Sequence, residues 1–196
     1  RYNNFPLPKT KIINLNIKKI KSAFIDLETI KLVKFFLDKN EQVLFFLNRR
    51  GYAPYLICKN CGYKQTCPNC SMYLTFHKNK NRAVCHHCSH EKEISRTCKD
   101  KKNCDFIMYG PGVEKIFEEV KNIFPNNKVE IFSSDYMQKK KKISKLFKKI
   151  NNNEVDILIG TQMISKGFNF PKLNCVVVID ADFSGRGYDL RTTEKN

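Results

Sequence analysis

Apolar residues in this sequence form two kinds of pattern, short continuous runs and runs with helical spacing. Continuous runs at 42–48, 155–159 and 175–179 predict strands that are buried on both faces of a parallel sheet, because such strands have no polar side. Shorter runs at 11–15 and 129–132 predict two more strands. The predicted strands are therefore spread along most of the chain.

Helical spacing of apolar residues predicts three helices between these strands. The first begins at an N-cap, Asp26, and continues to about Asp38, while Pro125 ends the second. The three apolar faces are Ile30, Val33, Phe36 and Leu37; Val113, Ile116, Phe117, Val120, Ile123 and Phe124; and Ile143, Leu146, Phe147 and Ile150. Strands that alternate with helices are typical of a parallel α/β sheet, so we predict an α/β fold.

This pattern stops after Tyr55 and resumes at Gly110, and the intervening segment is rich in cysteine. We therefore divide the chain into the start of an α/β lobe at 1–54, an insertion at 55–108 and the remainder of the lobe at 109–196. The insertion interrupts a connection from a strand to a helix. In open α/β sheets such connections lie at the carboxyl edge of the strands, where ligands bind. The insertion is thus placed to act on whatever the sheet binds.

Four pairs of cysteines in the insertion have spacings that suit metal ligands. Three pairs are C-x-x-C, namely Cys58/Cys61, Cys67/Cys70 and Cys85/Cys88, and the fourth, Cys98/Cys104, has a longer loop. Two C-x-x-C turns can supply the four thiolates of a tetrahedral zinc site, which favours zinc over a disulfide framework. The long loop leaves the ligands of the fourth pair open. Nearby histidines could substitute, although solvent-facing positions are more typical of them: His77, His86, His87 and His90.

Three other features bear on the class of protein. The ninth cysteine, Cys175, adjoins the apolar run at 176–179 and is predicted to be a small buried hydrophobe. No apolar run is long enough to span a membrane, and the N-terminus lacks the core of a signal peptide, so we expect a cytoplasmic protein without a membrane partner. The chain does not begin with methionine, and we expect it to be a piece of a longer protein.

The formal net charge is +17, from 36 Lys and Arg against 19 Asp and Glu. This excess favours a phosphate-rich partner such as nucleic acid, and a composition biased towards lysine and asparagine explains it equally well. The lysines at 139–142 fit the solvated face of a helix better than a phosphate-binding patch. Charge alone therefore does not decide the partner.

Two further segments give a resemblance when they are taken together with the cysteine pairs, FFLNRRGYAP at 45–54 and IGTQMISKGFNFP at 159–171. The chain closely resembles the second motor lobe of the primosomal protein N′ (PriA) family of bacterial replication-restart helicases, over essentially its whole length. The blocks NRRGY and GTQM are similar to motifs of superfamily 2 helicases, and the cysteine-rich insertion between them sets this family apart. The resemblance implies a RecA-like helicase lobe with a parallel sheet, interrupted by a small two-zinc module.

The same resemblance implies an activity and a set of partners. The family is one of ATP-dependent 3′→5′ DNA helicases that recognise stalled replication forks and initiate primosome assembly, with ATP and Mg as cofactors of the intact protein. The implied partners are DNA at forks and at junctions of single strands with duplex, the primosome proteins, and single-stranded DNA-binding protein.

Site residues follow from the resemblance position by position. One structural zinc is implied at Cys58, Cys61, Cys98 and Cys104, and the other at Cys67, Cys70, Cys85 and Cys88. Residues implied to face nucleotide or the DNA backbone are Arg49, Arg50, Gly160, Thr161, Gln162, Lys166 and Gly167. Taken without the resemblance, these last positions also suit an ordinary polar loop and a charged strand end.

The sequence contains no G-x-x-x-x-G-K-[ST] loop for phosphates, and it ends before the arginine-rich last helicase motif of the family. Helicase ATP sites form between two lobes, so we expect no complete catalytic site and no ATP hydrolysis by this chain alone. Two other classes remain open: a non-enzymatic, zinc-dependent DNA-binding module on an α/β scaffold, and a thiol redox protein with an exposed reactive C-x-x-C.

Overall fold

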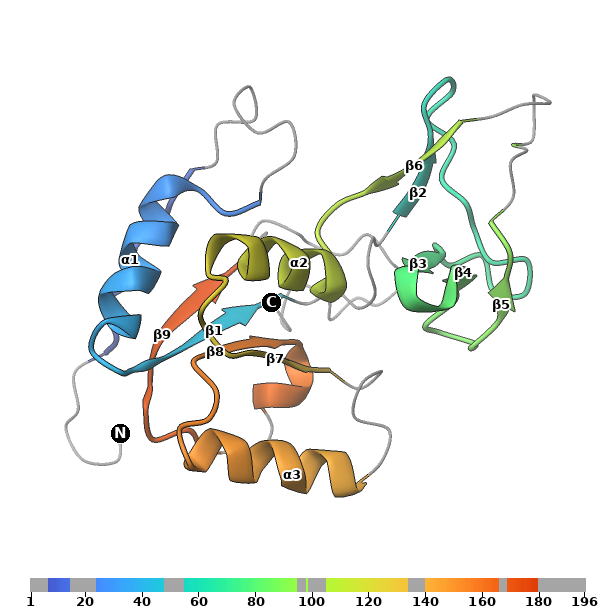
Figure 1. The fold of residues 1–196 in the computed structure, drawn as a ribbon. Coiled ribbons are helices and arrows are strands. Elements are labelled where there is room, and N and C mark those ends of the chain that lie inside the picture. Colours follow the sequence, from blue (N-terminus) through green and yellow to red (C-terminus); the bar gives the residue numbers. More distant parts are fainter. Residues whose placement is uncertain are drawn as a thin grey trace.

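The computed structural model of the chain describes residues 7–14, 24–47, 55–94, 98, 105–133, 140–165 and 169–179. These residues form an α/β lobe around a four-stranded parallel sheet and a smaller module with two antiparallel sheets, which stands beside the lobe (Figure 1). The α/β fold class predicted from the sequence is confirmed. None of the described helices is long and apolar enough to cross a membrane.

The sheet of the lobe has the strand order β7-β8-β1-β9, and all neighbouring strands are parallel. Its strands are β1 Gln42–Phe46, β7 Val129–Phe132, β8 Ile157–Gly160 and β9 Leu173–Val178. In the register of the sheet, Phe46 lies between Gly160 and Val178. The carboxyl ends of β8, β1 and β9 therefore meet at one edge of the sheet.

Two predictions about strands were wrong. β9 is not buried on both faces, because its burial alternates and the side chains of Val176 and Val178 are 54% exposed. It lies at the end of the sheet, where α1 packs on the face that carries Cys175 and Val177. The segment 11–14 is not a strand: it has no partner strand among the described residues, and the side chain of Ile12 is 86% exposed. Leu15 lies outside the described residues.

The three predicted helices are present. They are α1 Leu27–Leu37, α2 Val113–Ile123 and α3 Lys140–Asn151. Asp26 caps α1 as expected, since its Oδ1 accepts a hydrogen bond from the amide of Thr29 at 2.7 Å. A short 3-10 turn, η4 Gln162–Ser165, follows β8.

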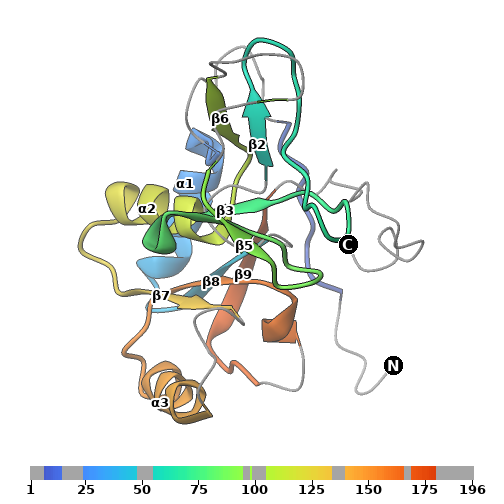
Figure 2. The same cartoon turned by 90° about the vertical axis from the view of Figure 1, so that its right-hand side faces the viewer.

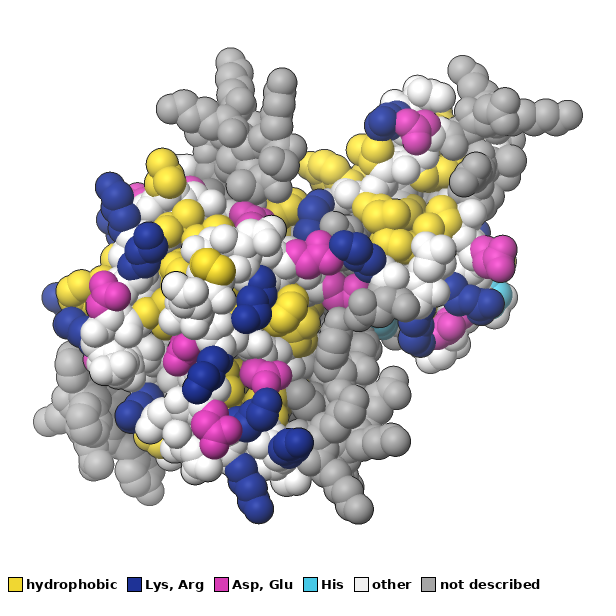
Figure 3. All heavy atoms as spheres, viewed as in Figure 1, with side chains coloured by type: hydrophobic (Ala, Val, Ile, Leu, Met, Phe, Trp, Pro, Cys, Tyr) yellow, Lys and Arg dark blue, Asp and Glu magenta, His cyan; other side chains and the backbone are white. Residues whose placement is uncertain are grey.

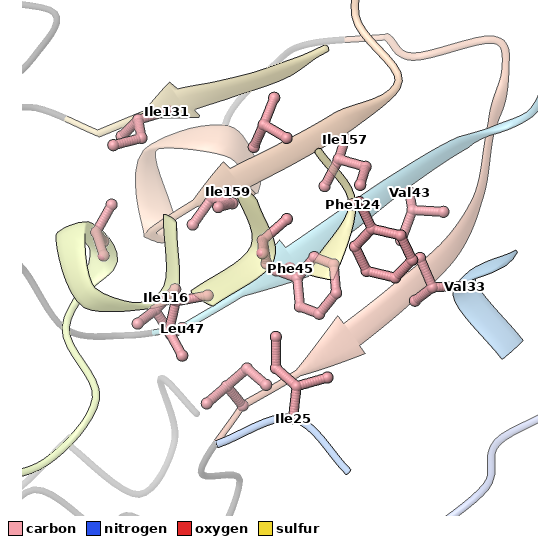
Figure 4. Packing of buried hydrophobic residues seen from close by; sticks show 14 residues of the cluster. Ile25, Val33, Val43, Phe45, Leu47, Ile116, Phe124, Ile131, Ile157 and Ile159 are labelled. Atoms are coloured by element: carbon pink, nitrogen blue, oxygen red, sulfur yellow. The ribbon is translucent and has the colours of Figure 1, made fainter. Parts of the chain in front are cut away.

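The helices cover the two faces of the sheet, and each face has its own core. Along β1, the side chains of Val43 and Phe45 point to the face covered by α1 and α2, where Figure 4 shows the packing. Leu44 points to the other face, which is covered by α3 and η4. The first core is Ile25, Val33, Val43, Phe45, Leu47, Val113, Ile116, Val120, Phe124, Val129, Ile131, Ile157, Ile159 and Ile179. This two-sided burial explains why β1, β7 and β8 were visible as apolar runs.

The module begins and ends with paired strands. β2 Tyr55–Cys58 pairs antiparallel with β6 Phe106–Tyr109, and Tyr55 lies opposite Tyr109. Between them, β3 Thr75–His77, the 3-10 turn η3 Lys78–Lys80, β4 Arg82–Val84 and β5 Glu91–Lys92 form a three-stranded sheet. The module has a small core of its own that includes Leu56, Leu74 and Phe76. Figures 1 and 2 both place its β3–η3 part next to α2.

Candidate metal centres

The three C-x-x-C turns share one backbone conformation. In the first, the amide of Gly62 donates to the carbonyl of Cys58 at 2.9 Å, and the amide of Cys58 donates to the carbonyl of Tyr63 at 2.8 Å. The other two turns repeat this pair of hydrogen bonds. In the second, the amide of Ser71 donates to the carbonyl of Cys67 at 2.9 Å and the amide of Cys67 donates to the carbonyl of Met72 at 2.7 Å. In the third, the amide of Ser89 donates to the carbonyl of Cys85 at 2.9 Å and the amide of Cys85 donates to the carbonyl of His90 at 2.8 Å. Each turn thus folds back on itself and directs two sulfur atoms to the same side.

The residue after the second cysteine of each turn has a left-handed backbone. Its φ is 71° at Gly62, 60° at Ser71 and 60° at Ser89. Glycine accepts this conformation without strain, whereas serine adopts it at a cost. This feature was not predicted, although the small residue that follows each C-x-x-C was a usable sign of it.

The inner cluster brings four sulfur atoms together from two turns. The Sγ atoms of Cys67, Cys70, Cys85 and Cys88 all lie within 4.8 Å of one another. The Cys67–Cys88 distance is 3.5 Å, Cys70–Cys85 is 3.4 Å and Cys70–Cys88 is 3.6 Å. Four thiolates at about 2.3 Å from a tetrahedral zinc lie roughly 3.8 Å apart. The sulfurs are therefore spaced for one ion, and they are too far apart for disulfides, whose S–S bond is about 2.05 Å.

Electrostatics in the inner cluster also suit a cation. Burial raises the pKa of the Cys67 thiol, but amide hydrogen bonds from Asn69 and Cys70 lower it to about 7. The amide of Met72 lowers the pKa of Cys70, whereas burial and the hydrogen bonds with Cys85 and Cys88 raise it to about 12. One thiolate therefore forms readily while its neighbours resist a second negative charge. A divalent cation removes that repulsion, so the donor set fits zinc.

The outer cluster is described in part. The Sγ atoms of Cys58, Cys61 and Cys98 lie within 4.8 Å of one another, and the Cys61–Cys98 distance is 3.6 Å. Cys104, predicted as the fourth ligand, lies outside the described residues. The amide of Tyr63 lowers the pKa of Cys61, but hydrogen bonding with Cys58, burial and Cys98 raise it overall. These three sulfurs show the same crowding as the inner cluster.

The histidines of the module are not part of either cluster among the described residues. The expectation that they face solvent was wrong for His77, whose exposed fraction is 6%. Its Nε2 lies 2.9 Å from Nε2 of His86, and its Nδ1 lies 3.5 Å from Oε1 of Glu114. His87 is exposed. Cys175, far from both clusters in the sequence, is half-buried against the core of the lobe, and this burial raises the pKa of its thiol.

At the carboxyl edge of the sheet, the structure describes three of the seven residues predicted to face nucleotide or DNA. Gly160 ends β8, Thr161 is buried and Gln162 begins η4. A Cβ on Gly160 would lie 3.1–3.3 Å from side-chain atoms of Ile164, so close packing by η4 accounts for the glycine. Arg49, Arg50, Lys166 and Gly167 lie outside the described residues.

The described surface of the molecule carries charges of both signs. On the face in Figure 3, the Lys and Arg side chains of the described residues are interspersed with Asp and Glu. Several lysines among the described residues form ion pairs, such as Lys149 with Glu130 at 2.6 Å and Lys80 with Glu91 at 2.7 Å. These pairs partly neutralise the positive charge of the described residues.

Comparison with known proteins agrees with the cysteine clusters. Residues 67–92, which contain the inner cluster, match the model of the PriA DNA helicase Cys-rich region (CRR) domain. The whole chain is 43% identical over 197 residues to the replication restart protein PriA of Rickettsia felis, and 30% identical to that of Bacillus subtilis. It is 35% identical over 184 residues, or 94% of the chain, to the PriA of Haemophilus influenzae.

The chain spans only part of these relatives, 30% of the length of the Rickettsia felis protein, 24% of the Bacillus subtilis protein and 25% of the Haemophilus influenzae protein. Within that part the likeness is continuous, and it includes both the α/β lobe and the cysteine-rich module. The chain therefore belongs to the PriA replication-restart family.

Proposed function

We propose that the chain is the second motor lobe of an ATP-dependent 3′→5′ DNA helicase that recognises stalled replication forks and initiates primosome assembly in the cytoplasm. The observation that carries this proposal is the combination of whole-length likeness to PriA with cysteine sulfurs that converge for metal binding. In this proposal, 1–54 and 109–196 belong to the lobe and 55–108 is its zinc-binding insertion. The ATP site, with Mg, forms only together with a second lobe.

Two structural zinc ions are part of the proposal. Cys67, Cys70, Cys85 and Cys88 would hold one, and Cys58, Cys61 and Cys98, with Cys104, the other. Bound zinc would cross-link the turns in addition to the small core and the paired strands, and it would hold the module in one shape. A site closed by four thiolates has no open position for water, so the metal has no catalytic task here.

The carboxyl edge of the sheet is the proposed contact with nucleotide and DNA. Ligands of parallel α/β sheets bind at this edge, where Gly160 ends β8 and Thr161 and Gln162 follow it. Arg49, Arg50, Lys166 and Gly167 are proposed to join them. Backbone and hydroxyl groups at such a site contact phosphate and sugar without reading the base sequence. This suits a motor that moves along DNA of any sequence, with primosome proteins and single-stranded DNA-binding protein as further partners.

Metal analysis of the purified chain tests the zinc centres. We expect two zinc ions in the unmodified chain, one in the Cys67→Ser variant and one in the Cys98→Ser variant. The matched control is Cys175→Ser, which should leave two because Cys175 lies against the core of the lobe. A folded chain without stoichiometric metal would overturn this part of the proposal.

The helicase assignment is tested separately by the coding sequence upstream of Arg1. An in-frame G-x-x-x-x-G-K-[ST] loop, together with DNA-stimulated ATP hydrolysis by the longer product, is the expected result. A longer product that binds zinc and DNA but carries no such loop would favour the non-enzymatic DNA-binding module instead.

A further inference from the structure

A buried polar contact joins the module to the lobe at the start of α2. Glu114, in the first turn of α2, has an exposed fraction of 7%, and its Oε1 lies 3.5 Å from Nδ1 of His77 at the end of β3. Its other oxygen, Oε2, accepts a hydrogen bond from the amide of Lys78 at 3.2 Å. Both carboxylate oxygens of Glu114 are thus used by the module.

The contact continues to the inner metal cluster. Nε2 of His77 lies 2.9 Å from Nε2 of His86, with their rings 5.0 Å apart between centroids. His86 directly follows Cys85, whose sulfur belongs to the inner cluster. A path of adjacent groups therefore leads from Cys85 through His86 and His77 to Glu114.

Burial makes this path energetically important. A carboxylate or an imidazole removed from water is costly unless it has a hydrogen-bonding partner, so Glu114 and His77 each depend on the other being in place. The position at the N-terminus of α2 further favours a negative side chain. By contrast, the nearby pair of Lys78 and Glu118 is 52% and 43% exposed, and such surface pairs contribute little.

α2 connects this contact with the rest of the lobe. Its residues Val113, Ile116 and Val120 are fully buried against the sheet. Further along the helix, Glu119 accepts hydrogen bonds from the amides of Phe24 and Ile25 at 2.7 and 3.0 Å. The position of α2 therefore affects both the sheet and the entry to α1.

We propose that the contact between Glu114, His77 and His86 couples the inner zinc centre to α2, so that metal binding and the position of the helix stabilise each other. This inference rests on the zinc centres of the proposed function and adds a role for residues that are not metal ligands. Coupling of this kind is reciprocal: if zinc stabilises the packing of α2, the packing of α2 raises the affinity for zinc by the same factor.

Glu114→Gln is the most direct probe, because glutamine keeps the shape but has one oxygen where the contact uses two. Its amide nitrogen would meet either the amide of Lys78, donor against donor, or Nδ1 of His77, which can accept only in the tautomer that carries its proton on Nε2. In a Cys98→Ser background, which retains the inner centre, we expect Glu114→Gln to lower zinc affinity about fivefold or more in competition with a chromophoric chelator. In a Cys67→Ser background, which retains the outer centre, affinity should not change.

Glu118→Gln is the matched control on the same helix, and it should leave both affinities unchanged. Hydrogen exchange gives the converse measurement, since the amides at the start of α2 should exchange faster in Cys67→Ser than in the unmodified chain. Unchanged inner-centre affinity in Glu114→Gln, or unchanged exchange of α2 after loss of the inner zinc, would overturn the coupling while leaving the zinc centres intact. A chain that binds no zinc would overturn the proposed metal centres themselves, and this inference with them.

Discussion

The side chain of Gln42 donates to the carbonyl oxygen of Ile150, although the two residues are 108 positions apart in the sequence. Nε2 of Gln42 lies 3.1 Å from that oxygen and 3.0 Å from the carbonyl oxygen of Val155. Gln42 begins β1 and has an exposed fraction of only 3%. One buried amide thus fixes the end of α3 and the approach to β8 against the central part of the sheet.

Gln42→Met should therefore lower the free energy of unfolding by about 1–3 kcal/mol, because two carbonyl oxygens lose a buried donor while the volume is retained. Denaturant unfolding of the zinc-loaded chain measures the effect. Lys31→Met, on the exposed side of α1, is the control and should change stability by less than about 0.5 kcal/mol. Equal effects of the two substitutions would contradict the role of Gln42.

Gly160→Ala should destabilise the lobe by about 1–3 kcal/mol, because the added Cβ would press on the side chain of Ile164 at 3.1–3.3 Å. Combining it with Ile164→Ala removes two of the three close atoms, Cδ1 and Cγ2, and leaves only Cβ at 3.3 Å. The double variant should therefore lose less than the sum of the two single losses. Strict additivity in denaturant unfolding would show that the two side chains do not interfere.

Ser71→Gly should raise the stability of the zinc-loaded module by about 0.5–1 kcal/mol, because glycine adopts the φ of 60° at this position without strain. Ser71→Val should have the opposite effect, since a β-branched residue is disfavoured there. Thermal unfolding with saturating zinc measures both. If the two variants shift the midpoint in the same direction, the left-handed turn is not what determines stability.

Glu119→Gln should alter the pH dependence of stability. Burial raises the pKa of Glu119, and its hydrogen bonds from Ile25 and Phe24 and the charge of Lys115 offset only part of this. The folded state therefore holds the proton more tightly than the unfolded state, and stability from this group is lost as pH rises from the ordinary value of 4.5 through the raised pKa.

In Glu119→Gln that loss should disappear, so the variant gains stability relative to the unmodified chain as pH rises through this window. Unfolding by urea at a series of pH values, expressed as the difference between the two chains, makes the comparison. Glu118→Gln supplies the control, because its carboxylate is partly exposed and pairs with Lys78 at the surface. A difference that does not vary with pH would contradict the burial of Glu119.

Most of the lobe could be predicted from the sequence because its elements carry a strong local signal. β1 and β8 lie inside the sheet, so both of their faces are apolar, and Asp26 and Pro125 mark helix ends by local chemistry. The exposure of Val176 and Val178 could not be predicted in this way. It depends on the place of β9 at the end of the sheet, which only the order of the strands reveals.

The C-x-x-C turns were predictable for a similar reason, since the spacing within each turn is a local property, whereas the grouping of the turns into clusters was implied by the resemblance. The burial of His77 was not, because it depends on Glu114, which is 37 positions further along the chain and belongs to the lobe. Nor did any local pattern indicate that 11–14 lacks a partner strand. Contacts between distant segments determined both outcomes.

The pairing of Tyr55 with Tyr109 has a consequence for how this architecture could vary among relatives. Paired residues of antiparallel strands lie about 5 Å apart, so the segment between them leaves and re-enters its host at nearly one point. A segment closed in this way can be lengthened, shortened or exchanged without changing the distance between the two points at which it joins the lobe. Such an arrangement allows the module to be replaced during evolution while the fold of the lobe stays unchanged.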